Sequence, residues 1–270
     1  MDELRLCLLF AREDLLEILA TCVERGGTAT GFPEGGPLTK SETREPQYQV
    51  CLDDFQSRGS ERLGLMTSES WRKDPRHLVF SLARYKFVGK MFAGRRNVLE
   101  VGCGDAIGTR IVRQEVKALT AVDFDPLFVE DAIKRSTPPW TFELLVHDVR
   151  RGPVPGSFDA TYALDVLEHI PADEEHEFLS KMLASLEPNG AAIIGMPSLE
   201  SQSYASEQSR SGHVNCKSAP ELRGLMQKFF WNVFMFSMND EVVHTGFHKM
   251  AHYIIALGCG KRLGSDAPTA

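Results

Sequence analysis

Three glycines follow an apolar run in the segment VLEVGCGDAIGTR, which spans residues 98–110. A dinucleotide-binding turn has the spacing G-x-G-x-x-G, in which the third glycine lets a helix pack closely beneath a pyrophosphate. Here Ile107 occupies the place of that third glycine, and the next glycine is Gly108. Glu100, directly before the turn, would also repel a phosphate. The spacing therefore favours a cationic ligand with an amino-acid end over a pyrophosphate.

Acidic and imidazole side chains follow the next three apolar runs. Asp123 closes the run ALTAVD, Asp148 follows FELLVH, and Asp165, Glu168 and His169 follow FDATYAL. Open parallel sheets bind ligands at the carboxyl ends of their strands, near the point where the strand order reverses. We therefore expect the glycine turn and these side chains to share one site.

Strand-like and helix-like patterns alternate along most of the chain, which predicts a parallel sheet covered by helices on both faces. Ser218 and Glu221 have capping-box spacing, and the last two apolar runs follow each other without a helix between them. The fold class we expect is α/β, Rossmann-like, with a seven-stranded, mostly parallel sheet and an antiparallel terminal strand. We expect strands over 97–101, 118–124, 142–149, 158–167, 190–197, 231–238 and 250–258, and helices over 75–91, 108–116, 127–134, 172–186 and from Ser218 on.

The N-terminal part differs in composition from the rest. Leucines with helical spacing predict an amphipathic helix over residues 2–24, which would pack on its own domain or form a homodimer. Residues 28–62 are rich in Gly, Pro, Ser and charge, which predicts a loop or lid. We expect an N-terminal helix and linker over 1–70, the main domain over 71–260 and a flexible tail over 261–270.

Composition restricts the classes of function. The chain has 270 residues, a formal net charge of −7 and six cysteines without any C-x-x-C pair. The negative charge disfavours nucleic acid as a partner, and the cysteine spacing indicates neither a zinc site nor a disulfide framework. The first residues are acidic where a signal peptide would be basic, and no stretch has the roughly 18 apolar residues of a membrane span. We therefore expect a cytoplasmic protein that does not contact a membrane.

Taken together, the motifs resemble those of class I S-adenosylmethionine-dependent methyltransferases. LEVGCGDAIG is similar to the first motif of that family, AVDFDP to its acidic loop, HDV and FDATYALDVLEHIP to the third and fourth motifs, and SLEPNGAAIIGMPS to the following helix-turn-strand. The resemblance covers about residues 80–257 and is strongest for the small-molecule, type-11 branch. One departure is Ala106, where the family often has glycine.

The resemblance implies a cofactor site for S-adenosylmethionine. Gly102 and Gly104 would let the backbone approach the methionine and ribose, and Asp123 would accept hydrogen bonds from the ribose hydroxyls. Asp148 and the Val149 N–H would meet the adenine. The cofactor-binding residues that we expect are Arg84, for the methionine carboxylate, Glu100, Gly102, Gly104, Asp123, Asp148, Val149 and Asp165.

Methyl transfer to oxygen or nitrogen also needs a base near the acceptor. We expect the catalytic residues to be His169, His213 and Asp165, with His244 and His248 as further imidazoles at the same rim. We expect no metal. As an alternative, Asp165, Glu168, His169 and His213 resemble the E-x-x-E-H plus His arrangement of metal-dependent branches, which include ubiquinone O-methyltransferases and small-RNA 2′-O-methyltransferases.

We therefore expect an enzyme that methylates an O or N of a small polar acceptor, such as a sugar, a sugar nucleotide or a secondary metabolite. The alternatives are a metal-assisted O-methyltransferase of RNA or of a quinone precursor, and a non-catalytic protein that binds S-adenosylmethionine and serves an assembly. A nicotinamide-dependent oxidoreductase is a further alternative, against which the glycine spacing and the reversed terminal strands count.

Overall fold

The computed structural model describes residues 42–246 and 248–263 of the chain. The predicted N-terminal helix over 2–24 and most of the predicted tail lie outside these residues. The chain divides into two compact units, Met1–Ser60 and Glu61–Ala270, and the second contains the whole sheet. None of the helices in the described residues is long and apolar enough to cross a membrane.

The loop predicted over residues 28–62 is wrong for its second half. A 3-10 turn, η1 (Pro46–Tyr48), leads into the helix α2 (Gln49–Arg58), which ends at Gly59 with a φ of 77°. Asp54 and Arg58, one turn apart, form an ion pair along this helix. The glycines and prolines that suggested a loop lie before Gln47, so the averaged composition concealed a helical segment of ten residues.

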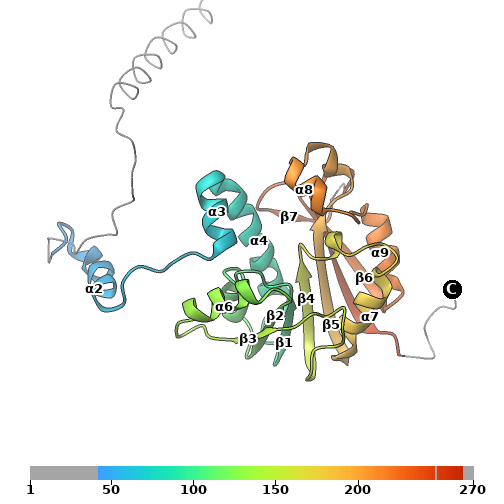
Figure 1. The fold of residues 1–270 in the computed structure, drawn as a ribbon, viewed down its shortest axis with the longest axis horizontal. Helices are drawn as coiled ribbons and strands as arrows, with labels where there is room; N and C mark the ends of the chain where they lie inside the picture. Colours follow the sequence, from blue (N-terminus) through green and yellow to red (C-terminus); the bar gives the residue numbers. More distant parts are fainter. Residues whose placement is uncertain (1–41, 247, 264–270) are drawn as a thin grey trace, which may run out of the picture. The chain divides into compact units, whose positions relative to one another are not determined.

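The second unit is built on one mixed sheet with the strand order β3-β2-β1-β4-β5-β8-β6-β7 (Figure 1). Strands β1 to β5 pair in parallel, and β8 runs antiparallel to both β5 and β6. The predicted Rossmann-like sheet with a reversed terminal strand is confirmed, with an eighth strand of two residues that is too short to show periodicity. The strands are β1 (Val98–Val101), β2 (Leu119–Asp123), β3 (Glu143–Val146), β4 (Phe158–Leu164), β5 (Leu186–Pro197), β6 (Phe230–Met238), β7 (Val243–His244) and β8 (Tyr253–Lys261).

Helices cover both faces of this sheet because alternate strand residues point to opposite sides. Leu99 and Val122 belong to one buried cluster, together with α7 and α9, whereas Val98 and Ala121 belong to the other, together with α4, α5 and α6. The helices of the second unit are α3 (Leu65–Lys73), α4 (Pro75–Met91), α5 (Thr109–Arg113), α6 (Pro126–Arg135), α7 (Glu175–Ala184), α8 (Glu207–Gly212) and α9 (Ala219–Gln227), with 3-10 turns η2 (Leu167–His169), η3 (Glu200–Tyr204) and η4 (His248–Met250).

Helix α4 has the predicted limits, but α3 was not predicted. Pro75 lies in the first turn of α4, and the Asp74 side chain accepts a hydrogen bond from the Arg76 N–H. In α3 the large apolar residues Met66 and Trp71 are both more than half exposed, and Thr67 is its buried residue. A helix that buries so little apolar surface leaves no amphipathic pattern in the sequence.

Candidate active site

The turn after β1 has a backbone shape that side chains resist. Gly102, Gly104 and Ala106 have φ angles of 77°, 51° and 56°. A Cβ at Gly102 would lie 2.3 Å from Val166 Cγ2, so this position needs glycine for space as well as for conformation. Ala106 adopts a left-handed conformation at a cost of roughly 1–2 kcal/mol, which gives a physical reason for glycine at this place in related sequences.

Asp123 holds this turn against the end of β2. One carboxylate oxygen accepts from the Gly104 N–H at 2.8 Å, and the other accepts from the Asp125 N–H at 3.0 Å. A carboxylate has about four acceptor positions, so two remain for a ligand. The Asp123 carbonyl also accepts from the His147 N–H at 2.8 Å, which brings the loop after β3 beside the loop after β2.

A cavity of about 900 Å³ opens over the glycine turn. Gly102 and Gly104 form part of its floor, and the inserts after β5 and β6 form part of its wall. His77 and His252, which were not among the predicted site residues, line it, whereas His244 and His248, which were predicted at this rim, do not. The lining of this cavity includes Met66, Thr67, Phe80, Arg84, Asp165, Glu168, His169, Ser201, Gln202, Ser209, His213, Asn239, Asp240, Glu241 and Tyr253.

Arg84, which is buried, and Asp165, which is partly exposed, form an ion pair in this wall. Arg84 Nη1 donates to Asp165 Oδ2 at 2.5 Å, and the guanidinium lies 3.8 Å from the Tyr253 ring centre and 4.5 Å from that of Phe80. Burial disfavours the charged guanidinium, but the charge and hydrogen bond of Asp165, together with the neighbouring Tyr253 and Tyr85, outweigh burial and raise the pKa of Arg84. Asp165 itself has a left-handed φ of 57°, a strain of the kind that functional sites retain.

Glu168 is a carboxyl group without a hydrogen-bond partner among the described residues. Its side chain is fully buried, and neither oxygen has a partner there. Its backbone carbonyl accepts from the N–H groups of Val214 and Asn215, which fixes the residue in place. Burial, and then the neighbouring Asp165 charge, raises the pKa of Glu168 well above its usual value. Such a group is costly to bury unless a ligand completes its bonding.

Two imidazoles lie beside Glu168 with their orientations set by hydrogen bonds. His169 Nδ1 donates to the Gly212 carbonyl at 2.9 Å, and His213 Nδ1 donates to Gln202 Oε1 at 3.1 Å. The ring centres are 5.3 Å apart, and one potential ligand atom from each of His169, His213 and Glu168 lies within 4.8 Å of the others. Because each Nδ1 carries a hydrogen, each neutral ring keeps an acceptor lone pair on Nε2. Burial, and then His169, lowers the pKa of His213.

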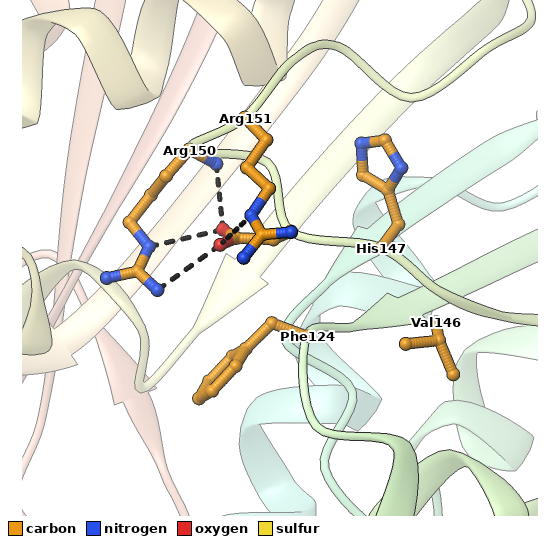
Figure 2. A pocket seen from close by; sticks show the side chains of 6 residues that line it. Phe124, Val146, His147, Arg150 and Arg151 are labelled. Carbon is orange, nitrogen blue, oxygen red and sulfur yellow. Dashed lines mark hydrogen bonds and ion pairs between the residues drawn. The ribbon is translucent and has the colours of Figure 1, made fainter.

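A smaller cavity of about 350 Å³ lies at the ends of β2 and β3 (Figure 2). Asp148 lines it, and its carboxylate accepts from Arg150 Nε at 3.1 Å and pairs with Arg151 Nε at 3.6 Å. Phe124, which sequence reasoning missed, lies beside these groups with 64% of its surface exposed. The sequence signal that could have identified Phe124 is an aromatic residue directly after the acidic end of a strand. Val149 is buried and does not line the cavity.

Glu100 is fully buried and lines neither cavity. Burial raises its pKa to about 7, the hydroxyls of Thr109 and Tyr162 act in the opposite direction, and Asp123 adds a small further increase. Glu100 was predicted to bind the cofactor, but it has no direct contact with either cavity.

Comparisons with known proteins show what part of this chain is similar to. Residues 98–190 match the family model described as a methyltransferase domain. The mitochondrial ubiquinone biosynthesis O-methyltransferase of Schizosaccharomyces pombe is 28% identical over 127 residues, which are 44% of this chain and 45% of that protein. The matched stretch thus spans less than half the length of that relative.

Solved structures share the fold. The N-methyltransferase NodS of Bradyrhizobium japonicum, in complex with S-adenosyl-L-homocysteine, has a TM-score of 0.52 at 18% identity over 70% of this chain and 91% of its own. The complex named DhpI-SAM-HEP has a TM-score of 0.53 at 17% identity over 80% and 99%. The chain therefore contains a segment that matches the methyltransferase-domain family model, and it shares the fold of these methyltransferases. Residues 98–190, from β1 into β5, are the part that the methyltransferase family model identifies.

The raised pKa of Glu100 predicts a pH dependence of stability. The folded state keeps this proton up to about pH 7, whereas the unfolded state releases it near pH 4.5, so the free energy of unfolding falls as the pH rises between these values. The full difference corresponds to about 3 kcal/mol. In Glu100→Gln this loss is absent, so denaturant titrations should show the variant gaining stability relative to the wild type from pH 4.5 to pH 7.

Glu168 also resists ionisation, but it is present in both proteins and cancels from the difference. A stability difference between wild type and Glu100→Gln that stays constant over this pH range would contradict the prediction.

Proposed function

We propose that the protein transfers the methyl group of S-adenosylmethionine to an oxygen or nitrogen of a small polar acceptor. The observation that carries this proposal is the wall of the larger cavity. There, two oriented imidazoles and a carboxyl group without a partner lie together, and the glycine turn lines the same space. A neutral imidazole beside an acceptor is suited to remove its proton.

The residues present fit the cofactor. Left-handed glycines leave the turn without side chains where the methionine and ribose would lie, and Asp123 keeps acceptor positions for the ribose hydroxyls. Phe124 and Asp148 line the neighbouring cavity, where an adenine would find an aromatic face and a carboxylate. When bound, S-adenosylmethionine supplies an electrophilic methyl group on a sulfonium sulfur.

Arg84 and Asp165 have complementary roles in this proposal. The guanidinium holds Asp165 on the methionine side of the cavity. Arg84 Nε has no hydrogen-bond partner among the described residues, and the N–H groups that do not bond Asp165 would serve the methionine carboxylate. Glu100 is buried beneath the turn, keeps its proton up to about pH 7 and lines neither cavity, so it would make no direct contact with a ligand there. Arg84 and Asp165 remain in the proposed cofactor site.

His169 and His213 are the acceptor-side residues. Each Nδ1–H is held by a carbonyl oxygen, so each Nε2 is available to accept the acceptor proton or to orient its hydroxyl or amine. The acceptor would be a sugar, a sugar nucleotide or another polar metabolite, because the inserts around it supply hydroxyl, amide and carboxylate groups. The residues that would bind it are Ser201, Gln202, Ser209, Asn239, Asp240 and Glu241.

Production of S-adenosylhomocysteine in the presence of sugars, amines and phenols tests the activity. We expect one acceptor class to raise product formation above background, and His213→Gln to lower kcat by roughly 10²-fold or more, the range for loss of a general base. His176→Gln is the matched control, because His176 is exposed on α7 and stacks on Phe229 outside the cavity. Binding of S-adenosylmethionine without turnover for any acceptor would instead indicate the non-catalytic alternative.

A second candidate function, metal-assisted O-methylation, is favoured by one observation. Glu168, His169 and His213 offer a mixed oxygen and nitrogen donor set, and each imidazole donates its other N–H to a carbonyl, as metal-bound histidines do. Asp165, the fourth residue of the predicted set, is paired with Arg84 instead. Donors on one ion lie roughly 3 Å apart, so a cluster 4.8 Å wide would have to contract. A bound divalent ion would acidify an acceptor hydroxyl.

Exhaustive chelation separates the two functions. For the metal-free reaction, which we favour, we expect the rate of methyl transfer to be unchanged after treatment with EDTA. Loss of activity on chelation, restored by Mn²⁺ or Mg²⁺ in the wild type and not in Glu168→Gln, would overturn the metal-free proposal and establish the second function.

A further inference from the structure

Helix α3 is fastened to the glycine turn by a carboxylate that is 38 residues away in sequence. Asp105 Oδ2 accepts from the Thr67 N–H at 2.7 Å, and Asp105 Oδ1 accepts from Thr67 Oγ1 at 3.1 Å. Both side chains are buried, so no solvent competes for these bonds. The residue before α3 is Gly64, which has no side chain to cap the helix, and Asp105 takes over that task from the turn.

The packing at this junction leaves no free space. A Cβ at Gly64 would lie 2.3 Å from Asp105 Oδ2, and a Cβ at Gly104 would lie 2.9 Å from Met66 Sδ. Met66 and Thr67 both line the larger cavity, next to the turn that forms its floor. Helix α3 is therefore a wall of the space in which we place the methionine part of the cofactor.

Asp105 is also held from the other side. Arg135 Nη2 donates to the Asp105 carbonyl at 2.6 Å, and the same arginine pairs with Asp131 one turn earlier in α6. The backbone of Asp105 is thus fixed to α6, while its side chain holds α3. The turn is therefore held independently of α3, whereas α3 is bonded to the turn through the Asp105 side chain.

Few apolar contacts hold α3 in place. Leu65, Met66 and Trp71 are each about half exposed, so the helix buries little apolar surface. Segments with few apolar contacts open at low free-energy cost. The two hydrogen bonds of Asp105 are consequently a large share of what keeps α3 docked on the turn.

We propose that Asp105 and Thr67 are positioning residues that couple the docking of α3 to cofactor binding. This inference rests on the proposed cofactor site. A cofactor in the cavity contacts both the turn and α3, so it binds the docked state more tightly than the open one. By reciprocity, cofactor binding increases the docked fraction, and loss of the Asp105–Thr67 bonds lowers the apparent cofactor affinity by the fraction that opens.

Calorimetric titration with S-adenosylhomocysteine, paired with hydrogen exchange, tests the coupling. In Thr67→Val, which keeps the shape and removes the hydroxyl, we expect the dissociation constant to rise roughly 5- to 10-fold, as expected for one lost buried hydrogen bond. Gly64→Ala should weaken binding further, because its Cβ displaces the Asp105 carboxylate. In the wild type, the amides of residues 65–73 should exchange more slowly once S-adenosylhomocysteine is bound.

Two variants separate this coupling from a general loss of stability. Thr67→Ser keeps both donors to Asp105 and should restore near wild-type affinity. Ser68→Ala removes the neighbouring hydroxyl, which donates to the Leu63 carbonyl and not to Asp105, and should bind like the wild type. Thermal unfolding of each variant provides the readout that a merely structural effect would move.

The proposal is overturned if Thr67→Val and Gly64→Ala bind S-adenosylhomocysteine as the wild type does, or if exchange over residues 65–73 is unaffected by the ligand. If the wild type fails to bind the ligand at all, the cofactor proposal fails, and with it the coupling. In that case, faster hydrogen exchange of α3 in ligand-free Thr67→Val than in the wild type would still show that the Asp105–Thr67 hydrogen bonds hold α3 on the turn.

Discussion

Asp123 holds the turn after β1 in place, and Asp105 fastens helix α3 to that turn. The Asp123 carboxylate accepts from the Gly104 N–H, and the Asp105 carboxylate accepts from the Thr67 N–H of α3. Gly102 and Gly104 adopt positive φ angles at little cost and Ala106 at a higher one, and the turn leaves its backbone bare toward the cavity. The placement of the cofactor, of α3 and of the loops after β2 and β3 all depends on this turn.

Charge organises the opposite wall of the cavity. Arg84 is enclosed by Tyr253 and Phe80 and paired with Asp165, and Glu168 is a second acid that is buried beside this pair. Glu168 is therefore held toward its protonated form, next to two imidazoles that present Nε2. A protonated carboxyl group both donates and accepts, which suits an acceptor hydroxyl and makes a bound cation the less favourable occupant.

The sequence predicted the parts of the fold that depend on long, regular patterns. The parallel sheet with helices on both faces followed from the alternation of helices and strands, and the reversed end from two adjacent apolar runs. Helix α3 escaped prediction because polar bonds to Asp105, rather than an apolar stripe, hold it. Arg84 was predicted to bind a ligand carboxylate, and the structure pairs it with Asp165. The sequence could not reveal this ion pair, because no spacing rule shows that residues 81 positions apart face each other. Glu100 was predicted to bind the cofactor, but the structure buries it. The sequence could not reveal this, because the burial of a single acidic residue leaves no pattern in it.

The central claim is that the turn is built for S-adenosylmethionine and not for a dinucleotide. Parallel calorimetric titrations of the wild type and Asp123→Ala with S-adenosylhomocysteine and with NAD⁺ test it most directly. We expect saturable binding of S-adenosylhomocysteine, weakened roughly tenfold or more in Asp123→Ala, and no binding of NAD⁺. Binding of NAD⁺ in place of S-adenosylhomocysteine, or equal affinity in the two proteins, would contradict this assignment.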